Sequence, residues 1–149
     1  MLLSKEIAVE LNLAACKLKQ YTGAMLRQSR IGLTPEQFLL LDLLWNQGPL
    51  TQQRIADQMQ KDKNSITKLV DAVERKGFVV RRRNTEDRRS NLIVPTAEAV
   101  RLKQRAKERG ISILDGILDG IGEPELRHFL ETMKKITARM SARLPGSGS

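Results

Sequence analysis

Apolar residues at helical spacing run through most of the chain and predict a mainly helical protein. Residues 2–29 are rich in Leu, Ala, Lys and Gln and contain no proline, and residues 36–47 are apolar almost all round. Both segments predict helices, and the all-round apolarity of the second places it at the centre of the fold. Thr34 and Pro35 indicate where this second helix begins, because Thr caps a helix N-terminus and Pro fits its first position.

Two short helices are expected next. Thr51 is placed to cap a helix over residues 52–60, and Asp62 to cap another over residues 63–76, ending before Gly77. The i, i+3, i+4, i+7 rule gives the second helix a buried stripe formed by Ile66, Leu69, Val70 and Val73. At about 100° per residue, the opposite side carries Asn64, Lys68, Asp71 and Arg75. Two short helices joined by a tight polar turn predict a helix-turn-helix.

A strongly charged segment follows this pair of helices. Residues 81–90, RRRNTEDRRS, contain five arginines and no apolar side chain, and they lie between the β-branched runs GFVV and NLIV. This pattern predicts a β-hairpin with arginines along its arms and at its tip. A hairpin directly after a helix-turn-helix makes a winged helix, expected over residues 33–95.

Two further helices are expected over residues 97–121 and 123–144, with Pro124 just inside the start of the second. The last helix has a long apolar stripe, made of Leu126, Phe129, Leu130, Met133, Ile136 and Met140. The apolar faces at both ends of the chain exceed what one small lobe can cover. Residues 2–29 and 96–143 are therefore expected to form a homodimer through an isologous contact.

The expected architecture is a single domain over residues 1–149, mostly α with a small β-hairpin wing, and a flexible tail at residues 145–149. Its 149 residues suit one domain, and 40% hydrophobic and 29% charged content is ordinary for a globular protein. No apolar run approaches the roughly 18 residues that cross a bilayer, so a cytoplasmic location with no membrane partner is expected.

One cysteine excludes an internal disulfide framework, and one histidine excludes most zinc sites. That histidine, His128, has no plausible Ser and Asp partners for a catalytic set, so no enzyme activity, metal or cofactor is expected. His128 is instead expected on a helix surface or at a dimer contact.

The charge distribution points to a polyanion. The chain has a net charge of +9, and residues 54–89 hold eleven basic and six acidic residues, which is over half of the excess in about a quarter of the chain. Aromatic residues make up only 3%, too few for the stacking platforms that hold single-stranded bases. Double-stranded DNA is therefore the favoured partner.

The segment LTQQRIADQMQKDKNSITKLVDAVERKGFVVRRRNTEDRRSNLIVPT resembles, in order and without gaps, the helix-turn-helix and wing of the MarR family of bacterial transcription regulators. The wing signature is present as Asp87-Arg88-Arg89, and LTPEQFLLLDLL resembles the second helix of the family. The resemblance covers about residues 10 to 142. After the wing, the family often has Leu-Thr-x-x-Gly where this chain has Pro95-Thr96-Ala97-Glu98-Ala99.

This resemblance implies a homodimer that binds a palindromic operator, usually as a repressor. Recognition helices enter successive major grooves, and the wings reach into flanking minor grooves. In many members of the family, a small phenolic or lipophilic effector binds between the dimer helices and the DNA-binding lobe and weakens DNA binding.

The expected DNA-binding residues lie on the second helix of the helix-turn-helix and on the wing. They are Lys63, Asn64, Ser65, Thr67, Lys68, Arg75, Arg81, Arg83, Asp87, Arg88 and Arg89. Arg81 and Arg83 are expected to meet phosphates, and Arg88 or Arg89 to enter a minor groove. Asn64 suits bidentate contact to adenine. Asp87 is expected to orient a nearby arginine by a charge-assisted hydrogen bond.

Two alternatives to an effector-controlled regulator remain. One branch of the MarR family senses peroxides through a cysteine on its first helix, so Cys16 could make this protein a redox-sensing regulator. The favoured interpretation is that Cys16 is a small buried hydrophobic residue. The other alternative is a winged helix that binds another protein, for which DNA retardation at low salt would be absent.

Overall fold

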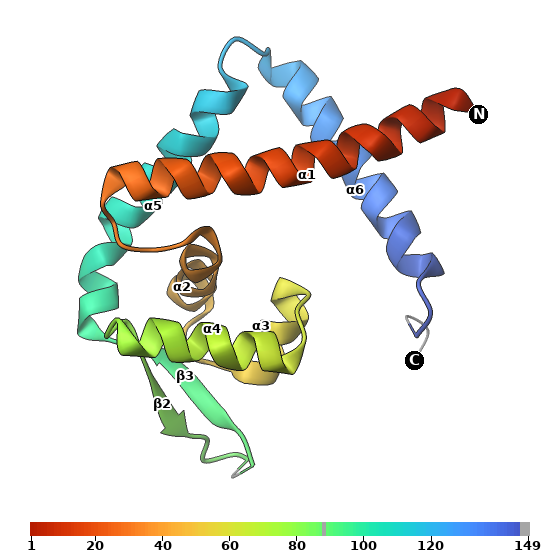
Figure 1. Ribbon diagram of the computed structural model, residues 1–149. Helices are drawn as coiled ribbons and strands as arrows, with labels where there is room; N and C mark the ends of the chain where they lie inside the picture. Colours follow the sequence, from red (N-terminus) through yellow and green to blue (C-terminus); the bar gives the residue numbers. More distant parts are fainter. Residues whose placement is uncertain (88, 147–149) are drawn as a thin grey trace. The chain divides into compact units, whose positions relative to one another are not determined.

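The computed structural model describes residues 1–87 and 89–146 and confirms a mostly helical fold with a small antiparallel sheet (Figure 1). The elements in chain order are α1 (Leu2–Ser29), α2 (Pro35–Gln47), β1 (Leu50–Thr51), α3 (Gln52–Met59), α4 (Lys63–Arg75), β2 (Val79–Arg83), β3 (Asn91–Pro95), α5 (Ala97–Leu118) and α6 (Glu123–Arg143). They form two compact units, Met1–Leu114 and Asp115–Ser149. Arg88 and most of the expected flexible tail, residues 147–149, lie outside the described residues.

The predicted helix starts are confirmed by hydrogen bonds at the caps. Thr34 and Gln37 form a capping box, in which each side chain accepts the backbone N–H of the other at 3.2 Å. Thr51 accepts the backbone N–H of Arg54 at 3.2 Å and so caps α3. These short-range bonds satisfy N–H groups that have no partner within a helix.

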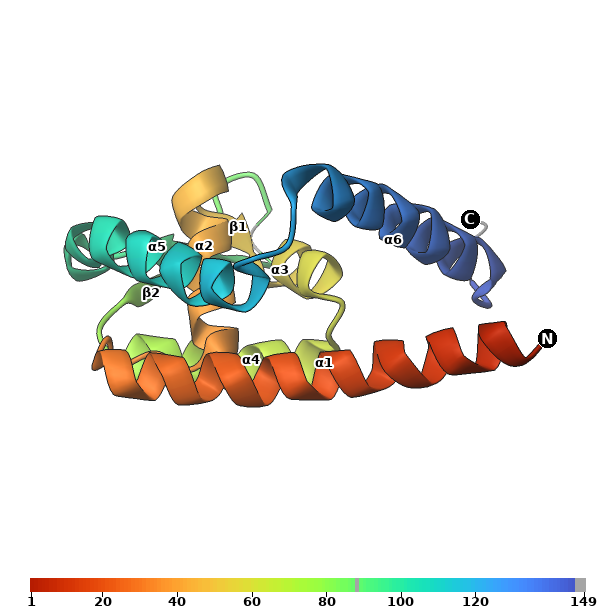
Figure 2. The same ribbon diagram turned by 90° about the horizontal axis from the view of Figure 1, so that it is seen from above.

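The core of the first unit is built around α2, which passes between α1 and α4 (Figures 1 and 2). Leu40, Leu41 and Leu44 of α2 are almost completely buried. The predicted buried stripe of α4 is confirmed, since Ile66, Leu69, Val70 and Val73 all belong to this core. Trp45 donates from its indole Nε1 to the carbonyl of Ala99 at 3.1 Å, which joins α2 to the first turn of α5.

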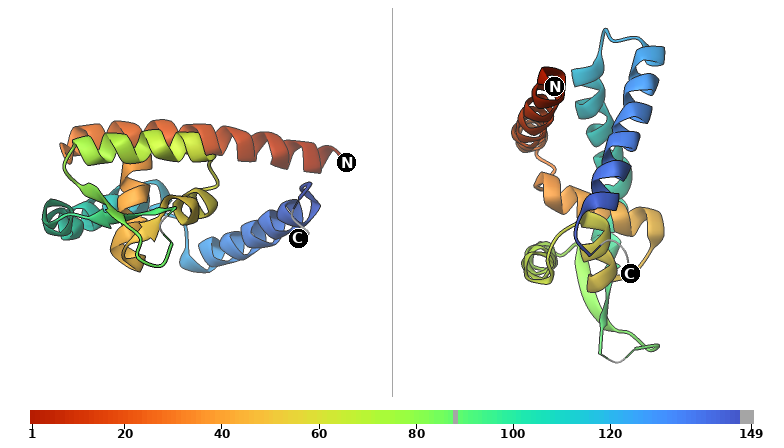
Figure 3. Two further views of the ribbon diagram at one scale, coloured as in Figure 1. Left: turned by 90° about the horizontal axis from the view of Figure 1, so that it is seen from below. Right: turned by 90° about the vertical axis from the view of Figure 1, so that its right-hand side faces the viewer.

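The sheet has the strand order β1-β3-β2, with both pairs antiparallel. The predicted hairpin with arginines along its arm is confirmed, because β2 continues through Arg83, which pairs with Asn91. The third strand, β1, is only two residues long and forms by pairing Leu50 and Thr51 with β3. Figure 3 shows the hairpin of β2 and β3 projecting beyond the helices of its unit.

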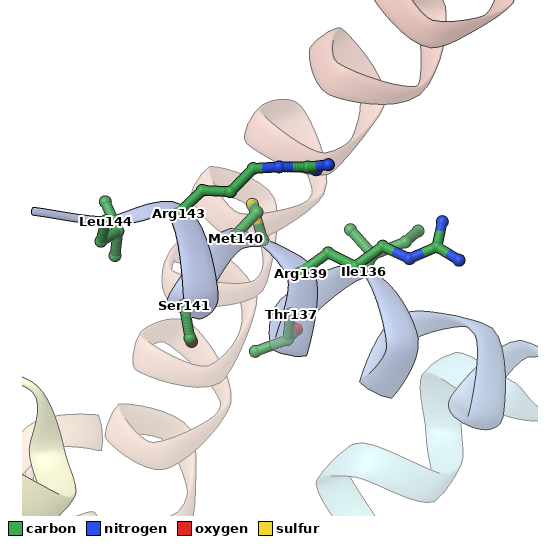
Figure 4. Close-up of a pocket in the computed structure, with 7 residues that line it drawn as sticks. All are labelled: Ile136, Thr137, Arg139, Met140, Ser141, Arg143 and Leu144. Atoms are coloured by element: carbon green, nitrogen blue, oxygen red, sulfur yellow. The ribbon is translucent and has the colours of Figure 1, made fainter. Parts of the chain in front are cut away.

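The second unit contains α6, and none of the described residues of this helix is buried. Phe129, Leu130 and Met140 have exposures of 61%, 53% and 52%. Residues between Ile136 and Leu144 line an open hollow along the last turns of α6. The side chains of Arg139 and Arg143, which are among the lining residues, extend away from the helix (Figure 4). The apolar stripe of α6 is therefore only partly covered, because its other members, Leu126, Met133 and Ile136, are half-buried.

Cys16 lies on the exposed part of α1, so the expectation of a buried cysteine is wrong. The first twenty residues of the chain are exposed apart from half-buried Leu11, because the core of the unit begins only near Gly23. His128 lies exposed on α6, as expected for a helix-surface residue. Among the helices of the described residues, none is both long enough and apolar enough to span a membrane.

The packing of α5 on α2 depends on Gly110. A Cβ atom at this position would lie 2.7 Å from Cζ of Phe38, closer than real Cβ contacts allow. We expect Gly110→Ala to lower the free energy of unfolding by about 1–3 kcal/mol, because the half-buried Phe38 ring, which packs against the core, must shift. Chemical denaturation followed by circular dichroism measures this change.

Gly23→Ala is the matched control, because the nearest atom to its added Cβ is the mobile end of Arg27 at 3.4 Å. There Ala should keep or raise stability, since Ala is favoured over Gly in a helix by about 1 kcal/mol. Equal stability of the two variants would contradict the close approach of Phe38 to Gly110.

Candidate nucleic-acid interface

The exposed side of α4 presents the polar residues that the sequence singled out. Lys63, Asn64, Lys68 and Arg75 are exposed, while the apolar stripe faces the core. The sequence therefore predicts the outward side of this helix correctly.

Asp62 and Ser65 fix the first turn of α4. The carboxylate of Asp62 accepts the backbone N–H of Ser65 at 2.8 Å and its hydroxyl at 2.9 Å. The hydrogen bond from the backbone N–H of Ser65 lowers the pKa of the Asp62 carboxyl most, and the bond from the Ser65 hydroxyl lowers it further. Both bonds favour the charged form of the carboxyl. The hydroxyl of Ser65, an expected DNA contact, is thus already engaged within the chain.

Thr67 is half-buried and also has partners inside the protein. Its hydroxyl donates to the carbonyl of Lys63 at 3.0 Å and accepts from Nε2 of Gln52, on α3, at 3.1 Å. Thr67 therefore lies on the side of α4 that meets α3, and not on the fully exposed side with Asn64.

The tip of the wing is held by side chains that bond to the nearby backbone. Oδ1 of Asn84 accepts the N–H of Glu86 at 3.1 Å, and Oδ1 of Asp87 accepts the N–H of Arg89 at 3.0 Å. Such bonds to the residue two positions on are typical of Asn and Asp in turns. Asp87 thus bonds to the main chain of Arg89, and its expected contact with an arginine side chain stays a prediction.

Arg81 has a different environment from the one the sequence suggested. Its guanidinium group donates to Asp71 at 2.6 Å and to Glu74 at 2.7 Å, both on α4, and its side chain is 22% exposed. The sequence predicts that Arg81 meets phosphates together with Arg83, whereas in the structure the guanidinium group of Arg81 already has two carboxylate partners within the lobe. Alternation along β2 turns Arg81 toward α4, but only the packing of β2 on α4 brings the carboxylates within reach.

Gln52 was not singled out from the sequence. Its side chain bridges Arg81 and Thr67, accepting from Nε of Arg81 at 3.3 Å. No sequence signal marks this residue, because its role depends on α3, α4 and β2 meeting in space.

Several other cations of α4 and the wing are available to an external anion. Lys63, Lys68, Arg75, Arg82, Arg83 and Arg89 are exposed, and none of them forms an ion pair with a described carboxylate. Arg88, the other expected tip residue, lies outside the described residues. A helix with exposed polar groups and an arginine-bearing hairpin thus belong to the same lobe (Figure 1). Among the described residues, no group of three or more His, Cys, Asp or Glu side chains could hold a metal ion.

A family model and curated relatives place the chain in the same protein family. The family model that matches residues 33–90 is the MarR family. The chain is 33% identical over 117 residues to the organic hydroperoxide resistance transcriptional regulator of Bacillus subtilis (strain 168), which covers 77% of each protein. It is 28% identical to the transcriptional regulator MhqR of the same organism, over 70% of this chain and 72% of MhqR.

Solved structures agree with this assignment. A MarR family transcriptional regulator from Rhodococcus sp. RHA1 superposes with a TM-score of 0.79 and 28% identity, covering 90% of this chain and 94% of that one. The repressor CouR bound to a 23-mer DNA duplex superposes with a TM-score of 0.81 and 25% identity, covering 91% and 94%. The chain belongs to the MarR family of winged-helix transcription regulators.

Proposed function

We propose that this regulator binds a palindromic DNA operator as a homodimer, represses transcription there, and is released by a small-molecule effector. The observation that carries the proposal is the set of exposed polar and cationic groups on α4 and the wing, on the lobe whose apolar residues form one buried core. The DNA-bound structure of CouR, a relative at 25% identity, supports DNA as the partner.

Each part of this surface suits one groove of duplex DNA. An α-helix fits the major groove, where Asn64 can pair with adenine and Lys68 with guanine or a nearby phosphate. Arg83 lies on a strand of the wing and suits a phosphate contact. Arg88 or Arg89 at the tip suits a narrow minor groove, where negative potential is concentrated.

The dimer is proposed to form through residues 2–29 and 96–143, with residues 33–95 as the DNA-binding lobe of a single domain. The uncovered apolar residues of α1 and α6 support this, among them Leu18 at 45% exposure and Phe129 at 61%. Uncovered apolar faces of this kind favour a protein partner, and a two-fold contact matches a palindromic site.

A small phenolic or lipophilic effector is proposed to bind between these helices and the lobe and to weaken DNA binding. The structure of CouR from Rhodococcus jostii RHA1 bound to p-coumaroyl-CoA, at 27% identity, supports the binding of a small ligand by a protein of this fold. A transcription regulator with this mode of control acts in the cytoplasm.

Oxidation of Cys16 is a second candidate signal. Two observations favour it: the thiol is exposed on α1, and a relative at 33% identity is an organic hydroperoxide resistance regulator. In this alternative an organic hydroperoxide transfers one oxygen to the thiolate, which gives a sulfenic acid and releases the alcohol. The oxidised protein then dissociates from the operator.

Selection of bound duplexes from a random DNA pool tests the proposed function. Enrichment of an inverted repeat followed by retardation of that duplex supports it. If no duplex is retarded at low salt, the winged helix is a protein-interaction module and DNA regulation is wrong.

Two variants should distinguish base recognition by α4 from the electrostatic attraction of the wing to phosphates. Asn64→Ala should weaken binding to the selected duplex by about 1–3 kcal/mol and relax preference at particular base pairs, because a base contact is lost. Arg83→Ala should weaken all duplexes alike and lower the slope of log K against log salt by about one unit. Fluorescence anisotropy at several salt concentrations measures both, and a uniform loss for Asn64→Ala would contradict its role as a base reader.

The α6 stripe should control the oligomeric state. Wild-type protein is expected to scatter light with twice the 16.8 kDa mass of the chain. Ile136→Glu should give monomers or aggregates, because a charge replaces an apolar group in the interface. Lys135→Glu is the matched control, since Lys135 points to the opposite side of the helix at about 100° per residue. A monomeric wild type at micromolar concentration would contradict the proposed dimer.

Cys16→Ser separates the two proposed signals. If a small ligand is the signal, the variant binds DNA like the wild type, and organic hydroperoxide releases neither protein through this residue. We expect this result, because the sequence has no second cysteine that could capture a sulfenic acid at Cys16 as a disulfide within the chain. Release of the wild type but not of Cys16→Ser by hydroperoxide, measured by anisotropy, would establish the redox alternative.

A further inference from the structure

Two carboxylates of α4 enclose the guanidinium group of Arg81. Nη2 donates to Oδ1 of Asp71 at 2.6 Å, and Nη1 donates to Oε1 of Glu74 at 2.7 Å. Asp71 and Glu74 are three residues apart and so lie on one side of α4. Glu74 also accepts the backbone N–H of Arg81 at 3.3 Å, so it binds both the main chain and the side chain of β2.

The same arginine reaches α3 through Gln52. Nε of Arg81 donates to Oε1 of Gln52 at 3.3 Å, and Nε2 of Gln52 donates to the hydroxyl of Thr67 at 3.1 Å. The hydroxyl of Thr67 in turn donates to the carbonyl of Lys63, in the first turn of α4. The chain of hydrogen bonds therefore joins β2 to both the beginning and the end of α4, with α3 as the bridge.

The local charge argues against Arg81 as a phosphate contact. Two carboxylates face one guanidinium group, so Asp71, Glu74 and Arg81 together carry a formal charge of −1. A phosphate approaching Arg81 would meet two like charges and would have to displace hydrogen bonds already made. Arg83, two residues along the same strand, is exposed and has no such described partner, so it offers the opposite environment.

We propose that Arg81 is a positioning residue, which with Asp71, Glu74 and Gln52 fixes the angle between the recognition helix and the wing. This inference rests on the proposed function, because it assumes that α4 and the wing bind one duplex together. Two elements that enter different grooves must both be in place, and a fixed angle lowers the conformational cost of binding. The forked geometry of arginine, with five N–H donors, allows one side chain to hold three partners.

The experiment compares affinity for the duplex selected from the random pool with affinity for a scrambled duplex of equal length, at several salt concentrations. Arg81→Ala should lower the operator-over-scrambled ratio at least tenfold and leave the salt slope unchanged. Arg83→Ala is the matched control, and it should lower the slope by about one unit with the ratio unchanged. Arg81→Lys should resemble Arg81→Ala, because an ammonium group keeps the charge but cannot reproduce the fork.

A second variant tests the cluster without touching Arg81. The double substitution Asp71→Ala with Glu74→Ala adds two positive units of net charge and removes both carboxylate acceptors of the guanidinium group. Positioning predicts that the ratio falls although the protein is more basic. If this variant binds both duplexes more tightly with an unchanged ratio, or if Arg81→Ala lowers the salt slope as Arg83→Ala does, the proposal is overturned. Circular dichroism checks that each variant is folded, and titration measures the fraction of protein that can bind DNA. Together they distinguish a folding defect from either result.

Failure of the proposed function has a different signature. If the wild type and Arg83→Ala retard neither duplex, DNA regulation is wrong and the inference falls with it. If the wild type prefers the selected duplex and Arg83→Ala behaves as expected, the proposed function stands. The Arg81 variants then decide only whether Arg81 is a positioning residue.

Discussion

Burial of one side of α4 determines what its other side can do. Ile66, Val70 and Val73 have no exposed surface, and they pack with Leu40, Leu41 and Leu44 of α2 in one core. A change of register by one residue would turn α4 by about 100° and expose these side chains to water. Fully burying one such side chain is worth about 1.5–3 kcal/mol, so the orientation is strongly held. Asn64, Lys68 and Arg75 face outward as a consequence.

Core packing sets the rotation of α4, but a second constraint sets its angle to the wing. The β2–β3 hairpin projects beyond the helices of its unit (Figure 3), and Val80, Arg82 and Arg83 on its first arm are exposed. Arg81 supplies the connection, since it pairs with Ile93 in the sheet while its side chain contacts Asp71 and Glu74 of α4. Charge is thus divided between two tasks: Arg81 is used inside the lobe, and Arg82, Arg83 and Arg89 stay available outside it.

Local chemistry explains which features the sequence could predict. The caps at Thr34, Thr51 and Asp62 and the stripe of α4 depend on residues a few positions apart, and all of them are confirmed. The partners of Arg81, the bridge through Gln52 and the short strand β1 depend on segments far apart in the sequence, so no periodicity marks them. Composition misplaced Cys16, because the apolar surroundings expected for a lone cysteine are absent along the first half of α1.

Methylation interference on the selected duplex tests most directly whether α4 and the wing bind one duplex together. Methyl groups on guanine N7 block the major groove, and those on adenine N3 block the minor groove. The account predicts guanine interference in two half-sites with centres one helical turn apart, about 10 base pairs or a multiple of this, and adenine interference in the flanks. Interference in neither groove, with binding intact, would contradict base reading by α4 and entry of the wing into the minor groove.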